Sequence, residues 1–172
     1  MDAIKAAIRI ISDFPKPGIQ FRDITPVLQD PRLFAAVIDA LAERYRPMDI
    51  SKIVAMESRG FVFAAPLAFA IGAGFVPLRK RGKLPYRTIS ESFSLEYGKD
   101  ELEMHEDAVE PGERVIVIDD LLATGGTAAA AVRLARRMGA EVLEAGFVIE
   151  LAGLHGRDRL KDVPVYSMIQ FD

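Results

Sequence analysis

The chain has 172 residues, of which 50% are hydrophobic and 27% are charged, a composition typical of a single globular domain with a full hydrophobic core. Its formal net charge of −3 gives no overall attraction to nucleic acid or to an anionic membrane, so neither is an expected partner. Cysteine is absent and histidine occurs twice, which excludes disulfides and thiolate metal sites and argues against a histidine-rich zinc site.

The N-terminal segment combines a helical pattern with an irregular stretch. Residues 2–13 place isoleucine and alanine on one helical face, so a helix is predicted there. Because this start is not a signal-peptide pattern, we expect a cytoplasmic location. Residues 14–31 contain four prolines and are predicted to be irregular. The pair Asp30-Pro31 has the pattern of a helix N-cap followed by proline, so the next helix is predicted to begin there.

An apolar region occupies the middle of the chain. Residues 52–56 are predicted to form a short buried strand. The stretch 60–78 has no charged residue and approaches the length of a membrane span, but prolines and glycines divide it. We interpret it as a buried helix, a glycine turn and a core strand over 75–78.

Residues 79–107 are polar, and their alternating pattern predicts a hairpin of two strands, 89–95 and 101–104. A long polar insertion in a compact domain is often a lid or a binding loop. Beyond it the apolar pattern resumes, with a helix predicted over 127–138 and strands over 115–118, 142–149 and 163–168. Strands that alternate with helices predict an α/β fold with a parallel sheet.

Residues 115–127 carry the strongest functional signal. Four β-branched residues predict a strand buried on both faces, and the carboxylates of Asp119 and Asp120 follow it. A loop rich in glycine and threonine then leads into an alanine-rich helix. Loop amides and a helix N-terminus suit a phosphate, and adjacent carboxylates suit sugar hydroxyls, so a sugar-phosphate site is predicted. A plain strand-end turn is the alternative. The loop lacks the Lys-Ser/Thr ending of a P-loop, and its glycine spacing does not match a dinucleotide-binding fingerprint.

Two further segments suit an anionic ligand. Ser58-Arg59-Gly60 follows a predicted strand, so its turn can expose amides to a pyrophosphate while Arg59 adds a bidentate donor. A capped helix start with an exposed arginine is the alternative. Residues 79–83 carry four cations in five positions, which fits a pyrophosphate clamp better than a solvated loop or a nucleic-acid patch, because the chain is acidic overall.

These features resemble the type I phosphoribosyltransferases. Residues 115–127 are similar to that family's motif for phosphoribosyl pyrophosphate. Further blocks resemble, in the same order, the members that act on adenine: 14–26, 57–61, 79–85 and 95–99. The resemblance implies a single domain over 1–172 with a parallel-sheet core and flanking helices. It also implies a flexible lid hairpin over about 79–107 and a small N-terminal hood that covers the base, over about 1–30.

The resemblance implies a purine salvage reaction in which the phosphoribosyl group of 5-phosphoribosyl 1-pyrophosphate is transferred to adenine, giving AMP and pyrophosphate. Asp119 and Asp120 would hold the ribose hydroxyls, and Glu96 would be the catalytic acid/base. Mg²⁺ would bind mainly through the substrate, with Asp119 or Asp120 contacting it through water. The expected assembly is a homodimer, in which Lys83 could come from the second subunit.

The other expected contacts are grouped by the part of the substrates that they bind. The loop assigned to the 5′-phosphate consists of Ala123, Thr124, Gly125, Gly126 and Thr127. The pyrophosphate is assigned to Ser58, Arg59, Arg79, Lys80, Lys83 and Tyr97. Adenine is assigned to Phe21 and Leu121, on its two faces, and to backbone groups of Gln20 and Arg22, at its edge.

Two alternatives remain open. A regulator that senses phosphoribosyl pyrophosphate would be expected to carry a DNA-binding domain or a basic RNA-binding face. The 172 residues leave no room for such a domain, and the net charge of the chain is negative. A 6-oxopurine enzyme usually has a lysine shortly after the phosphate loop, whereas the segment 127–139 has only arginines, which we expect on the solvent face. Tyr86 and Arg87, within the expected lid, have no explanation from the sequence.

Overall fold

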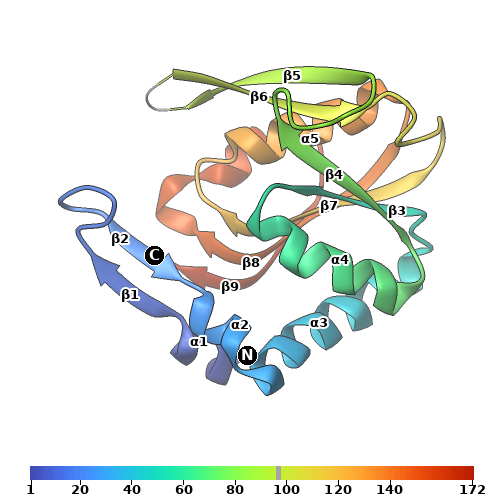
Figure 1. Cartoon of the computed structure of the whole chain (residues 1–172). Coiled ribbons are helices and arrows are strands. Elements are labelled where there is room, and N and C mark those ends of the chain that lie inside the picture. The colour runs from blue at the N-terminus through green and yellow to red at the C-terminus, as the bar shows by residue number, and fades with distance from the viewer. Residues whose placement is uncertain (96–97) are drawn as a thin grey trace.

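The computed structural model describes residues 1–95 and 98–172, without the side chains of 94–99. Within this range, seven strands form one sheet in the order β5-β6-β4-β3-β7-β8-β9 (Figure 1). The parallel strands are β3 (Lys52–Met56), β4 (Gly74–Lys80), β7 (Arg114–Leu122), β8 (Glu141–Leu151) and β9 (Val165–Phe171). The hairpin of β5 (Thr88–Leu95) and β6 (Gly98–His105) continues the sheet beyond β4 in antiparallel pairing.

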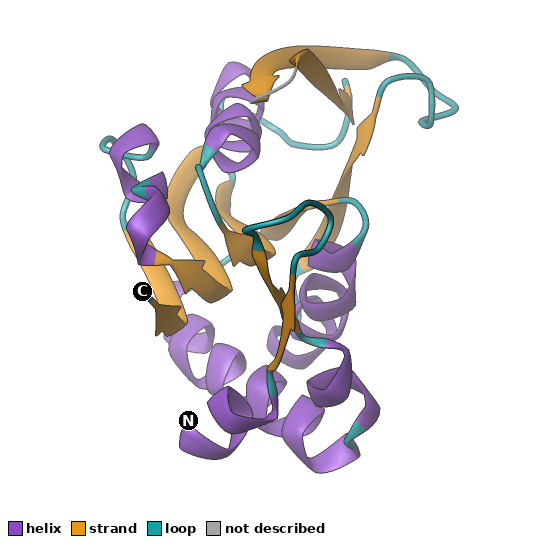
Figure 2. Cartoon of the chain, turned by 90° about the vertical axis from the view of Figure 1, so that its left-hand side faces the viewer, coloured by secondary structure: helices purple, strands orange, loops and turns teal. Residues whose placement is uncertain are grey.

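Helices cover both faces of the sheet (Figure 2). One face carries α1 (Asp2–Ala7), α2 (Thr25–Gln29), α3 (Pro31–Tyr45) and α4 (Arg59–Ile71), and the other carries α5 (Gly126–Arg137). The single turns that link these elements are η1 (Arg46–Met48), η2 (Ala152–Leu154) and η3 (Gly156–Arg159). Among the described residues, no helix combines the length and the apolar character that crossing a membrane requires.

The central strands bury side chains on both faces. In β3, Ile53 and Ala55 pack in the core on the α4 side, whereas Val54 and Met56 pack in the core on the α5 side. The same alternation continues through β7, which explains the unbroken apolar run that predicted it. Because these strands are parallel, the carboxyl ends of β3, β4 and β7 lie side by side at one edge of the sheet.

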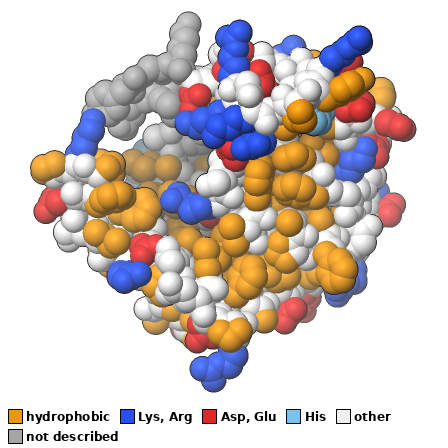
Figure 3. All heavy atoms as spheres, viewed as in Figure 1, with side chains coloured by type: hydrophobic (Ala, Val, Ile, Leu, Met, Phe, Trp, Pro, Cys, Tyr) orange, Lys and Arg blue, Asp and Glu red, His pale blue; other side chains and the backbone are white. Residues whose placement is uncertain are grey.

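A small antiparallel hairpin projects from the sheet and the helices near the N-terminus. β1 (Arg9–Ser12) pairs with β2 (Gln20–Asp23), and in Figure 1 this hairpin lies at the left while the β5–β6 hairpin lies at the top. On the face that Figure 3 presents, hydrophobic side chains gather over α4 and β4. Phe69 of α4 is 91% exposed.

The predicted fold class, an α/β fold with a parallel sheet, is confirmed, as are the hairpin and the helix that begins after Asp30. The Asp30 side chain caps that helix by accepting hydrogen bonds from the amides of Arg32 and Leu33 at 2.8 and 3.2 Å. The predicted strand over 115–118 is too short, because β7 continues to pair with β8 through Leu122. Asp119 and Asp120 therefore belong to the last part of a strand instead of following it.

The prediction for the N-terminus is wrong in two respects. The helix ends at Ala7, not at residue 13, and residues 9–12 form β1. The stretch 14–31 is also not irregular throughout, because it contains β2 and α2. The isoleucines at 10 and 11 fit a strand as well as a helix, and the partner strand that decides between them lies eight residues further along the chain.

Candidate active site

A cavity of about 420 Å³ opens at the carboxyl edge of the sheet, between the ends of β3, β4 and β7 and the β5–β6 hairpin. It brings together polar groups from α4, β4, β6, β7 and α5. Its lining residues are Met56, Glu57, Ser58, Arg59, Lys80, Phe93, Asp100, Leu102, Asp119, Asp120, Leu121 and Thr127. Carboxylates and cations therefore face one space, as a site for a charged, hydroxyl-rich ligand requires.

Asp119 and Asp120 meet Arg59 in this cavity. Arg59 Nε donates to Asp120 Oδ2 at 2.5 Å, and Asp120 itself is only 7% exposed. The backbone amide of Asp120 donates to Asp119 Oδ1 at 2.9 Å, which fixes the Asp119 side chain. Burial and the neighbouring Asp120 charge raise the pKa of Asp119 well above the usual aspartate value. A buried carboxylate whose pKa is raised by burial and by a neighbouring carboxylate is typical of a functional site.

Gly60 lets α4 approach this pair closely. A Cβ atom at Gly60 would lie 2.8 Å from Asp119 Oδ1 and 3.1 Å from the carbonyl oxygen of Ile118. Both distances are shorter than side-chain packing normally allows. The glycine in the first turn of α4 is therefore needed for the close contact between the start of α4 and the end of β7.

Residues 123–127, which are predicted to hold the 5′-phosphate and are called the phosphate loop below, line a separate hollow of about 80 Å³ that also reaches Asp119. Gly125 takes a left-handed conformation with φ of 78° and caps the start of α5, where Gly126 and Thr127 form the first turn. The first amides of a helix have no partner within the helix and carry the positive end of its dipole. The four residues 128–131 are all buried alanines, so α5 packs closely on the sheet and holds this amide cluster beside Asp119.

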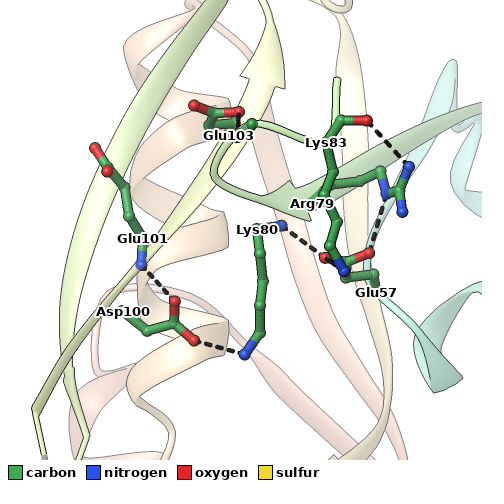
Figure 4. A network of polar contacts seen from close by, with 8 residues as sticks. Glu57, Arg79, Lys80, Lys83, Asp100, Glu101 and Glu103 are labelled. Carbon is green, nitrogen blue, oxygen red and sulfur yellow. Dashed lines mark hydrogen bonds and ion pairs between the residues drawn. The ribbon is translucent and has the colours of Figure 1, made fainter. Parts of the chain in front are cut away.

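Glu57 holds together the basic segment 79–83, which begins with the last two residues of β4 (Figure 4). Its carboxylate accepts from Arg79 Nε at 3.0 Å and from the Lys80 amide at 2.8 Å, and it lies 3.3 Å from Lys83 Nζ. Burial alone would raise the pKa of Glu57, but these bonds from Lys80, Arg79 and Lys83 outweigh it and lower the pKa. This role of Glu57 was not predicted from the sequence, although its position directly after a predicted strand was a usable signal.

Lys80 and Asp100 form a second pair, inside the cavity. Lys80 Nζ lies 2.9 Å from Asp100 Oδ2, and this hydrogen bond lowers the pKa of Asp100 (Figure 4). Of the described residues predicted to contact pyrophosphate, Ser58, Arg59 and Lys80 line the cavity, whereas Arg79 and Lys83 are not among its lining residues. Asp100 was not predicted, because only strand pairing brings it opposite the basic segment.

The residues predicted to contact the base do not all line one cavity. Phe21 and Arg22 line a second, mostly apolar cavity of about 380 Å³ under the β1–β2 hairpin, and Leu121 lines the first cavity. The Phe21 ring packs edge-on against Phe14, with centroids 5.2 Å apart. Arg59 lines both cavities, and its guanidinium carbon lies 5.7 Å from the Phe21 ring centroid. Gln20 precedes Phe21 on β2 and is exposed.

The C-terminal strand supports the segment that carries Phe21. The Phe171 ring of β9 lies 4.8 Å from the Arg22 guanidinium carbon and 5.0 Å from Lys5 Nζ, so two cations contact one ring. Lys5 Nζ also donates to the carbonyl of Gln170 at 2.8 Å. Arg22 Nε is buried without a hydrogen-bond partner among the described residues, so the aromatic ring is a main contact of that guanidinium.

The predicted residues Glu96 and Tyr97 lie outside the described residues. The hairpin that leads to them is tied to α5, since Glu91 of β5 accepts from Arg133 Nε at 2.6 Å and from Arg137 Nη1 at 3.1 Å. These arginines are exposed, as the sequence predicted. The structure also gives contacts to the two unexplained residues: Tyr86 packs edge-on against His105, and Arg87 pairs with Glu106 at 3.6 Å.

Comparisons with known proteins agree with this geometry. The family model of the phosphoribosyl transferase domain matches residues 23–171. An adenine phosphoribosyltransferase of Anaeromyxobacter dehalogenans is 55% identical over 99% of both chains. The crystal structure of adenine phosphoribosyltransferase from Thermoanaerobacter pseudethanolicus superposes with a TM-score of 0.96, at 49% identity over 99% of both chains. That from Saccharomyces cerevisiae, complexed with adenine and an imino-altritol bisphosphate, has a TM-score of 0.92 at 43% identity over 97% of this chain and 97% of that one.

Proposed function

The chain belongs to the phosphoribosyl transferase family, and from that premise we propose that it transfers the phosphoribosyl group of 5-phosphoribosyl 1-pyrophosphate to adenine. The products are AMP and pyrophosphate, so the reaction salvages a free purine base. One observation carries the proposal: the Asp119-Asp120 pair lies in one cavity with Arg59 and beside the amides of the phosphate loop. Adenine as the acceptor rests on the relatives, whose names and bound ligand specify it.

The donor fits across the two hollows at the carboxyl edge of the sheet. Its 5′-phosphate would lie in the phosphate loop at the start of α5, where amides and the helix dipole favour an anion. The ribose hydroxyls would donate to Asp119 and Asp120. The pyrophosphate would lie toward Ser58, Arg59 and Lys80, with Arg79 and Lys83 close by on Glu57. This order follows the donor molecule from its 5′ end to C1.

Mg²⁺ fits the donor set of this cavity. Mg²⁺ in proteins is often held by one or two carboxylates together with substrate phosphates. Asp119 and Asp120 supply two carboxylates, and the described residues contain no group of three or more potential ligands that would make a protein-only metal site. When bound, the cation would neutralise charge on the leaving pyrophosphate, with Asp119 or Asp120 contacting it through water.

The base would enter from the side of the β1–β2 hairpin. Phe21 offers an aromatic face for stacking, and backbone carbonyl and amide groups of Gln20 and Arg22 suit the exocyclic amine and the ring nitrogens of adenine. Leu121 would contact the opposite face of the base from the first cavity. Arg59, which lies between the two cavities, would have to turn toward the pyrophosphate for the base to approach C1.

The chemistry is a substitution at the ribose C1 atom. The bond from C1 to the pyrophosphate oxygen breaks, and pyrophosphate leaves with the electron pair of that bond. Adenine N9 forms the new bond to C1 and loses its proton. The sugar becomes cation-like on the way, so a rigidly held ribose and cations at the leaving group accelerate the reaction. Glu96 is proposed to take the proton, and Tyr97 to close over the site.

Exclusion of water is the remaining requirement, because water would hydrolyse the activated sugar. We assign it to the segment 79–107, acting as a lid, and to residues 1–30, acting as a hood over the base. The hairpin of the lid is anchored at Glu91 by Arg133 and Arg137, so closure would involve the part of the hairpin beyond this anchor.

We propose that the protein acts as a homodimer in the cytoplasm. Phe69, Val62 and Phe75 on α4 and β4 are 91%, 38% and 36% exposed, and the apolar area around them in Figure 3 suits burial against a second copy. Light scattering after size-exclusion chromatography should give twice the chain mass, and Phe69→Glu should shift it to one chain mass. The location follows from the substrate, since a charged sugar phosphate does not cross a membrane unaided.

A panel of bases tests the function directly. The purified chain with phosphoribosyl pyrophosphate and Mg²⁺ should form nucleotide from adenine and release an equal amount of pyrophosphate. Hypoxanthine, guanine and orotate should react at least about a hundred-fold more slowly, because their exocyclic groups do not match the backbone donors and acceptors at Gln20 and Arg22. Binding of the donor without product from any base would instead support a sensor.

A further inference from the structure

The backbone of Gly156, the first residue of η3, lies directly against the phosphate loop. A Cβ atom at Gly156 would lie 2.3 Å from the carbonyl oxygen of Ala123 and 2.9 Å from Leu122 Cδ1. In the reverse direction, a Cβ atom at Gly125 would lie 2.3 Å from the carbonyl oxygen of Gly156. The two segments are thus packed backbone against backbone, with no room for a side chain from either glycine.

Space, not backbone conformation, explains the glycine at 156. Gly125 needs glycine for its positive φ as well as for the contact, whereas Gly156 is absent from the residues with positive φ. The left-handed residue at this reversal is its neighbour His155, which is not a glycine. The backbone conformation at 156 would therefore accept an alanine. Only the contact of the added Cβ atom with Ala123 and Leu122 excludes it.

The segment that carries Gly156 is firmly anchored. Arg157 forms a two-bond pair with Glu150, from Nε to Oε1 and from Nη2 to Oε2, each at 2.7 Å. Arg157 Nη1 also donates to the carbonyl of Val165 at 3.0 Å. Glu150 belongs to β8 and is 4% exposed, so these bonds fix η3 to the sheet. A methyl group at 156 would consequently push the phosphate loop away instead of moving η3.

We propose that Gly156 is a positioning residue for the phosphate loop, and that it sets the affinity for the 5′-phosphate of the donor. The inference rests on the proposed function, because that function places a sugar phosphate monoester in the loop. Relief of a 2.3 Å contact requires a displacement of the order of 1 Å, which is enough to misalign loop amides with phosphate oxygens. The base subsite at Phe21 is formed by other elements and is not displaced.

The test compares Gly156→Ala with Gly153→Ala. Gly153 lies three residues earlier, in η2, and also has no positive φ. The nearest atom to its added Cβ would be 3.9 Å away, an ordinary contact. Gly156→Ala should raise KM for phosphoribosyl pyrophosphate by about ten-fold or more and weaken ribose 5-phosphate binding in calorimetry by a similar factor. KM for adenine should stay within about two-fold, and Gly153→Ala should match the wild type in all three measurements.

The inference is wrong if folded Gly156→Ala keeps the wild-type KM for phosphoribosyl pyrophosphate, or if both KM values rise equally. Should circular dichroism show that Gly156→Ala does not fold, Arg157→Lys decides the question, since it loosens η3 without adding bulk. Arg157→Lys should raise KM for phosphoribosyl pyrophosphate by about three-fold and leave KM for adenine unchanged. An unchanged KM for phosphoribosyl pyrophosphate would count against the inference. If the wild type forms no AMP, the proposed function fails, and the ribose 5-phosphate titration alone still tests the role of Gly156.

Discussion

Arg59 Nε donates to Asp120 Oδ2 at 2.5 Å, which joins the first residue of α4 to the end of β7. The same guanidinium lies 5.7 Å from the Phe21 ring and lines both cavities. One arginine thus occupies the boundary between the proposed donor and base subsites, where it can exchange the Asp120 carboxylate for pyrophosphate oxygens.

Arg59→Lys should lower kcat/KM for phosphoribosyl pyrophosphate by about a hundred-fold. Lysine keeps the charge but loses the planar fork that can bind two oxygens at once, and its shorter reach changes the pair with Asp120. Steady-state kinetics checks this, with Arg32→Lys as the control, because the Arg32 side chain is 92% exposed and lies on α3. Equal kcat/KM values for the two variants would show that Arg59 does not act on the donor.

Glu57→Gln should raise KM for phosphoribosyl pyrophosphate about ten-fold and lower the free energy of unfolding by about 1–3 kcal/mol. A glutamine offers one acceptor oxygen where the carboxylate now holds donors from Arg79, Lys80 and Lys83. Since the folded pKa of Glu57 is lowered, its stabilising contribution is present above the unfolded-state pKa and is lost as pH falls through the folded value. Urea titrations at pH 7 and pH 3 should therefore show a difference from wild type at pH 7 that shrinks at pH 3.

Asp119→Asn should make the protein more stable and less active. The pKa of Asp119 is raised in the folded state, so its ionisation destabilises the fold as pH rises above the unfolded-state pKa. Asparagine removes the buried charge and keeps an oxygen that can accept from the Asp120 amide. In thermal unfolding, the midpoint of the variant should exceed that of the wild type at pH 8 and approach it near pH 4. A lower midpoint for the variant than for the wild type at pH 8 would show that the Asp119 charge does not destabilise the fold.

Phe171→Leu should raise KM for adenine by up to about ten-fold and leave KM for phosphoribosyl pyrophosphate within about two-fold. Without the Phe171 ring, the Arg22 and Lys5 cations lose their shared contact. The β2 strand, which is proposed to bind the base, is then held less firmly. Phe171→Tyr keeps the ring and should behave like the wild type. If the tyrosine variant shows the same defect as the leucine variant, the cation–ring contact is not the cause.

The sequence predicted the parts of the site that are contiguous in the chain. Asp119, Asp120 and the phosphate loop lie within nine residues, so strand pattern, acid pair and glycine loop could be interpreted together. Most of the parallel sheet followed for the same reason, because its strands are apolar on both faces and each has a strong local pattern.

The residues that support the site were not predictable in this way. Asp100 meets Lys80 only because β6 pairs with β4, and Gly156 meets Ala123 only because η3 folds back along the sheet. Phe171 contacts Arg22 across nearly the whole length of the chain. The N-terminal error has the same origin, since the pairing of β1 with β2 overrode the helical periodicity of residues 9–12.

The proposed function depends above all on the Asp119-Asp120 pair, which would hold the ribose during transfer to adenine. The most direct test is the initial rate of AMP formation from adenine and phosphoribosyl pyrophosphate, measured with Mg²⁺ for the wild type and for the double variant Asp119→Asn, Asp120→Asn. We expect the double variant to be folded, by circular dichroism, and its rate to be at least about a thousand-fold lower than that of the wild type. A folded double variant with a near-normal rate would contradict it.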